Sequence, residues 1–81
     1  MPVVLRYKGY RFAFFSDEGD PLEPMHIRVS KAGTEVKFWL HPLVAVAHNK
    51  RVPLRDVREL MEIVQQNRAK LERAWNAHFR T

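Results

Sequence analysis

Four side chains that can contact or cleave nucleic acid stand at alternating positions in two apolar stretches of this chain. They are His26, Arg28, Lys37 and Trp39. Alternate side chains of an extended strand point to the same face, so the four are expected to share one surface, with Arg6 and Arg11 on a neighbouring open face. Lysine and arginine neutralise phosphates and a tryptophan ring stacks on bases. The set therefore predicts a binding surface for RNA or DNA.

The same group also contains the parts of a metal-independent ribonuclease. His26 would act as the acid and base, while Arg28 or Lys37 would steady the phosphate. The other histidines are His41, His48 and His78, and none forms an H-x-x-x-H pair on an expected helix. A single histidine outside any catalytic motif favours binding over catalysis, and both hypotheses stay open.

A cluster of acidic residues precedes this surface in the sequence. It consists of Asp17, Glu18, Asp20 and Glu23. Carboxylates are ligands for Mg²⁺ and Ca²⁺, but this spacing does not match a calcium-binding loop. Gly19, Pro21 and Pro24 in the same segment are typical of a turn. The segment is therefore interpreted as a solvent-exposed connection, and neither a metal site nor a cofactor is expected.

The overall charge favours an anionic partner. Fourteen Lys and Arg residues stand against nine Asp and Glu, which gives a net charge of +5 and a pI of about 10.1. There is no cysteine, so no disulfide can form. No apolar window is long enough to span a membrane, and the start lacks the apolar core of a signal peptide. A cytoplasmic protein without membrane contact is therefore expected.

The elements that must position these residues begin with two β-hairpins. The first joins residues 3–7 to 10–16 through Lys8-Gly9, and the second joins residues 26–31 to 35–40 through a loop at 32–34. The second hairpin alternates well. Its core-facing side chains are expected to be Ile27, Val29, Val36, Phe38 and Leu40.

From about Leu54 the apolar residues follow the three- and four-residue steps of a helix. The expected buried positions are Val57, Leu60, Met61, Val64, Leu71 and Trp75. No Gly or Pro stands between residues 54 and 81, so one long helix is the simplest interpretation, with a break near residues 65–68 as the alternative. Residues 43–47 fit either a short strand or the start of a helix after Pro42, and the segment that follows, 48–51, has the composition of a turn.

These elements predict a single α+β domain over residues 1–81, mainly β over 1–52 and helical over 53–81. Its antiparallel sheet of four to five strands comes from two hairpins and is packed by a long C-terminal helix. The core is small, and apolar residues occupy both faces of the second and fourth strands. Association is therefore expected, either as a homodimer or with a small protein partner.

Four segments carry a resemblance to a known family. They are MPVVLRYKGYRFAFFSDEG at the start, EPMHIRV after the acidic loop, EVKFWL in the fourth strand and AWNAHF at the end. The chain resembles the small prokaryotic family known as domain of unknown function 4160. Family members carry E-P-P-H-x-H-V at residues 23–29, so His26 matches the first histidine and Arg28 replaces the second. The resemblance implies a cytoplasmic protein with a small protein partner encoded nearby, as in toxin–antitoxin pairs, and a toxin that acts on RNA or translation.

Overall fold

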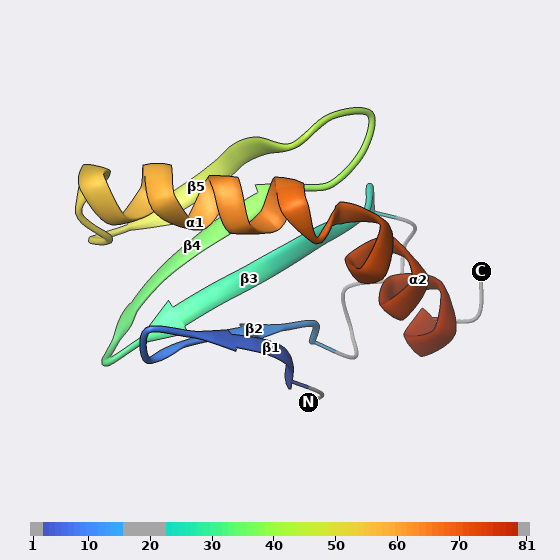
Figure 1. The fold of residues 1–81 in the computed structure, drawn as a ribbon, viewed down its shortest axis with the longest axis horizontal. Coiled ribbons are helices and arrows are strands. Elements are labelled where there is room, and N and C mark those ends of the chain that lie inside the picture. The colour runs from blue at the N-terminus through green and yellow to red at the C-terminus, as the bar shows by residue number, and fades with distance from the viewer. Residues whose placement is uncertain (1–2, 16–22, 80–81) are drawn as a thin grey trace.

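The computed structural model of the chain describes residues 3–15 and 23–79. Within these ranges the fold is α+β, with a five-stranded antiparallel sheet whose strands follow the order of the chain (Figure 1). The strands are β1 (Val3–Tyr7), β2 (Tyr10–Ala13), β3 (His26–Lys31), β4 (Thr34–Trp39) and β5 (Ala45–Lys50). The predicted sheet of four to five strands is therefore confirmed.

Both predicted hairpins form around two-residue turns. Lys8 and Gly9 have φ values of 48° and 82°, and Ala32 and Gly33 have values of 50° and 82°. Two consecutive positive φ values match the right-handed twist of the flanking strands. The second turn is one residue shorter than expected, because Thr34 already pairs with the last residue of β3.

Residues 45–50 form a strand, which settles the ambiguity in this part of the sequence. The expectation of a turn at residues 48–51 is wrong for its first three residues, since Lys50 pairs with Glu35 of β4. The chain reverses at Arg51, whose φ is 65°. The Asn49 side chain supports this reversal by bonding both the backbone N–H and the carbonyl oxygen of Val52, each at 3.0 Å.

The C-terminal segment is two helices rather than one. Helix α1 spans Leu54–Gln66 and α2 spans Arg68–Phe79, so the break falls where the alternative interpretation placed it. At the junction the side-chain amide of Asn67 donates to the carbonyl oxygen of Ile63 at 2.8 Å. A short polar side chain that bonds a nearby carbonyl in this way competes with the helical ladder. Figure 1 shows α1 lying across one face of the sheet and α2 turning away at its end.

The core lies between α1, α2 and the face of the sheet that they cover, which we call the inner face. Five of the six helical residues expected to be buried are buried, and Met61 is half-buried against them. The buried side chains of the sheet are mainly Tyr10, Phe12, Ile27, Val29, Val36 and Phe38. The opposite, outer face is left to the alternate residues of each strand.

Candidate functional site

The outer face of the sheet brings the predicted binding residues together. Strand register aligns one row of side chains across all five strands: Arg6, Arg11, Ser30, Glu35 and Lys50. The next row consists of Ala13, Arg28, Lys37 and His48, and the third contains His26, Trp39 and Ala45. All five predicted binding residues therefore lie on one surface, although four different strands supply them.

The cations of this surface differ in how far they are already neutralised. Arg28 lies 2.8 Å from Glu35, and Lys37 lies 3.3 Å from Glu23. Arg6, Arg11 and Lys50 are exposed, and within the described part of the chain they take part in no ion pair. The first row therefore carries the positive charge that is most available to a partner.

His26 is packed inside the protein, which differs from the outward-facing position expected for it. Its side chain is 0% exposed, and its Nδ1 atom lies 2.9 Å from the carbonyl oxygen of Pro24. The ring makes edge contacts with Trp39 and Trp75, with centroids 5.8 and 4.9 Å away. The reason is that α2 turns across the end of the sheet and brings Trp75 against the first residue of β3. An acid or base must reach its substrate, and this packing shields the ring.

Trp39 is only half-buried, but its ring is already in use. The ammonium of Lys37 lies 4.8 Å from the ring centroid, and His26 contacts the ring as described above. Cation–π and edge contacts of this kind hold an aromatic side chain in place. A nucleotide base could therefore stack only on the part of the Trp39 ring that Lys37 and His26 do not cover.

Sequence reasoning missed two residues of the outer face. Lys50 and His48 fell in the segment interpreted as a turn, yet the register of β5 adds them to the first and second rows. The alternation of apolar Val44 and Val46 is a weak strand signal that extends toward them. Pairing with β4 places them on this face, and that pairing joins residues 11 and 15 positions apart, beyond the range of local alternation.

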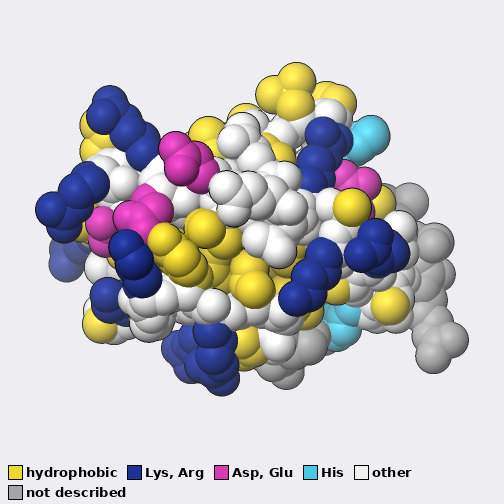
Figure 2. Space-filling view, in the orientation of Figure 1, with side chains coloured by type: hydrophobic (Ala, Val, Ile, Leu, Met, Phe, Trp, Pro, Cys, Tyr) yellow, Lys and Arg dark blue, Asp and Glu magenta, His cyan; other side chains and the backbone are white. Residues whose placement is uncertain are grey.

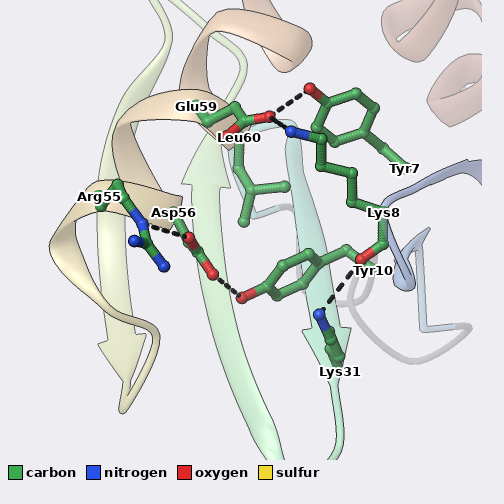
Figure 3. Close-up of a pocket in the computed structure, with 8 residues that line it drawn as sticks. All are labelled: Tyr7, Lys8, Tyr10, Lys31, Arg55, Asp56, Glu59 and Leu60. Carbon is green, nitrogen blue, oxygen red and sulfur yellow. Dashed lines mark hydrogen bonds and ion pairs between the residues drawn. The ribbon is translucent and has the colours of Figure 1, made fainter.

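A second feature lies on the inner side, between the first hairpin and the start of α1 (Figure 3). It is a hollow of about 440 Å³, which we call the tyrosine hollow. The Tyr7 hydroxyl donates to Glu59, and the Tyr10 hydroxyl donates to Asp56 at 2.8 Å. Lys8 lies 2.8 Å from the same Glu59 oxygen. These contacts join β1, β2 and α1.

The electrostatics of the tyrosine hollow hold each group in its ordinary charge state. The hydrogen bond from Lys8 lowers the pKa of Glu59, and the hydrogen bond from Tyr10 lowers the pKa of Asp56. The hydrogen bond to Glu59 raises the pKa of Tyr7, while desolvation is the largest cause of the raised pKa of Tyr10. Ionised carboxylates that accept from protonated phenols fasten the hairpin to the helix. They are not poised to transfer protons.

Two further observations bear on the expected function. In residues 3–15 and 23–79 no three His, Asp or Glu side chains gather in a way that would hold a metal ion. Asp17, Glu18 and Asp20 of the acidic cluster lie outside the described residues, and Glu23 pairs with Lys37. Neither helix in the described ranges is long and apolar enough to cross a membrane.

Comparison with known proteins identifies the family. Curated proteins and solved structures provide no match to the chain. Residues 9–76 match the family model described as Domain of unknown function (DUF4160). This range includes four of the five strands, α1 and most of α2, and the chain therefore belongs to the DUF4160 family.

Proposed function

We propose that this protein is a small basic binding protein whose outer sheet face contacts single-stranded nucleic acid. The observation that carries the proposal is the first row of that face, where Arg6, Arg11 and Lys50 are exposed and free of ion pairs among the described residues. An open sheet face with exposed cations suits an unpaired strand, whose phosphates contact the cations while the bases remain accessible.

The size of the electrostatic contribution follows from the number of phosphates that are contacted. Each contact releases condensed counterions, so the logarithm of the affinity falls with the logarithm of the salt concentration by about 0.7 for each phosphate of a single strand. Arg11 and Lys50 would account for about 1.4 of this slope together. Arg28 and Lys37 are expected to contribute less, because each must first leave its carboxylate partner.

The test is a salt titration of the affinity for a short labelled single-stranded RNA, followed by fluorescence anisotropy. The double variant Arg11→Ala/Lys50→Ala is expected to flatten the slope by about 1.4. The matched control is Arg58→Ala/Lys70→Ala, which removes the same charge from exposed positions on the two helices. An equal loss in both variants would mean that net charge alone is responsible. A wild-type protein without salt-dependent affinity would refute the proposal.

The described geometry gives the ribonuclease alternative no support. Its acid and base, His26, is buried, and the two cations that would steady the phosphate are paired with carboxylates. A role as one component of a toxin–antitoxin-like pair in the cytoplasm remains part of our proposal for the cellular setting. Co-expression with the neighbouring gene, followed by growth and RNA-cleavage assays, tests this role and the ribonuclease alternative together.

A further inference from the structure

The outer face contains a hollow of its own at the β3–β4 turn. It has a volume of about 270 Å³ and is lined by residues that include Arg11, Ser30, Gly33 and Lys50. We call it the Ser30 hollow. Its lining includes the outer-face row Arg11, Ser30, Glu35 and Lys50, and Lys31 at the end of β3 borders both this hollow and the tyrosine hollow. Of the residues predicted from the sequence to do chemistry, Arg11 alone borders it.

Two cations flank the Ser30 hollow. Arg11 and Lys50 belong to the same cross-strand row, with Ser30 and Glu35 between them. Neighbouring strands are about 4.8 Å apart, so the two backbones are roughly 14 Å apart, and both long side chains can converge above the serine. Figure 2 views the helix side of the molecule, where Lys and Arg side chains near the hairpin turns lie among Asp and Glu side chains.

The carboxylate in the hollow does not cancel this charge. Glu35 forms an ion pair with Arg28 at 2.8 Å. Its negative charge is therefore already neutralised and repels an anion in the hollow less. The hollow is polar and has room for a ligand. Ser30 contributes a hydroxyl group. A Cβ atom added at Gly33 would have no other atom within 4 Å, so the hollow is open beside this glycine.

We infer that the Ser30 hollow is a phosphate subsite, which holds one phosphodiester of the strand that crosses the outer face. Arg11 and Lys50 supply charge-assisted hydrogen bonds from two sides, and the serine hydroxyl donates from below. The inference rests on the proposed function for the identity of the ligand. It goes beyond that function in stating where one phosphate sits and which hydroxyl contacts it.

The experiment places a carboxylate in the hollow and compares it with the same change outside. Ser30→Glu introduces a negative charge beside Arg11 and Lys50. His48→Glu makes a comparable change at an exposed outer-face position in the next row. Backbone amide shifts are recorded by ¹⁵N NMR while inorganic phosphate replaces chloride at constant ionic strength, and then with single-stranded RNA.

In the wild type, phosphate is expected to shift the amides of residues 30–35. Ser30→Glu should abolish these shifts and weaken RNA binding about tenfold, as loss of a charge-assisted contact does. His48→Glu should retain the phosphate shifts and lose less RNA affinity. Thermal unfolding by circular dichroism confirms that each variant is folded, and Arg11→Ala/Lys50→Ala replaces Ser30→Glu if the latter is not.

The outcomes separate the two ideas. Two results would refute the phosphate subsite and leave the proposed function intact. One is an equal loss of RNA affinity in Ser30→Glu and His48→Glu. The other is that phosphate shifts the amide signals only of residues outside 30–35. Phosphate shifts at residues 30–35 without any RNA binding would refute the proposed function while the Ser30 hollow stands as an anion site.

Discussion

Replacing His26 with alanine is expected to destabilise the protein strongly, because its imidazole is part of the core. The ring is 0% exposed, bonds Pro24 and contacts two tryptophans. Truncating a buried aromatic side chain to alanine costs about 3–5 kcal/mol, and the imidazole, which is smaller than a phenyl ring, should fall near the lower value. An 81-residue domain has a free energy of unfolding of only about 4–12 kcal/mol. The loss is therefore a large share of the total.

The assay is thermal unfolding followed by far-ultraviolet circular dichroism. For a domain of this size each kcal/mol lowers the Tm by about 4–8 °C, so His26→Ala should lower it by at least about 12 °C. His41→Ala is the matched control, because His41 is exposed and its removal should leave the Tm nearly unchanged. A His26→Ala variant with a wild-type Tm and lost RNA cleavage would refute the structural role and restore the ribonuclease hypothesis.

Two further predictions concern acid stability and association. The carboxyl groups of Asp56 and Glu59 have pKa values below their ordinary 3.8 and 4.5, so the stability they contribute is present above those values and is lost as the pH falls through the lowered ones. The variant Asp56→Asn/Glu59→Gln should therefore show a flatter dependence of Tm on pH between about 2 and 5, and a slope as steep as that of the wild type would contradict the clamp in the tyrosine hollow. The small core also predicts a homodimer or a complex with a neighbouring gene product. Sedimentation velocity at micromolar concentration tests this, and a stable monomer with no co-purifying partner would exclude it.

Much of the fold follows from local patterns in the sequence. Period-two alternation predicted β3 and β4, Lys8-Gly9 predicted the first turn, and the loop predicted at 32–34 located the second turn but made it one residue too long. The three- and four-residue spacing after Leu54 identified the buried side of the helices. These patterns are short in range, since each depends on residues that are close along the chain.

The candidate site was predictable only in part. Alternation put Arg28, Lys37 and Trp39 on one face, and the structure agrees. Alternation did not show that Glu35 neutralises Arg28 or that Glu23 neutralises Lys37. Ion pairs of this kind depend on side-chain rotamers and on tertiary contacts. Alternation also could not add Lys50, whose place is decided by pairing with β4.

The sequence by itself determined the two hairpins, the amphipathic helical segment, the excess of basic residues and the membership of a family. Tertiary structure alone decided which cations are available and where the helical segment turns. The break at Asn67 carries Trp75 over the end of the sheet, where it buries His26. Strand register then lines up Arg11, Ser30 and Lys50 in one row. The physical reason is that burial and charge pairing depend on contacts between distant segments, whereas alternation and turn formation depend on neighbours along the chain.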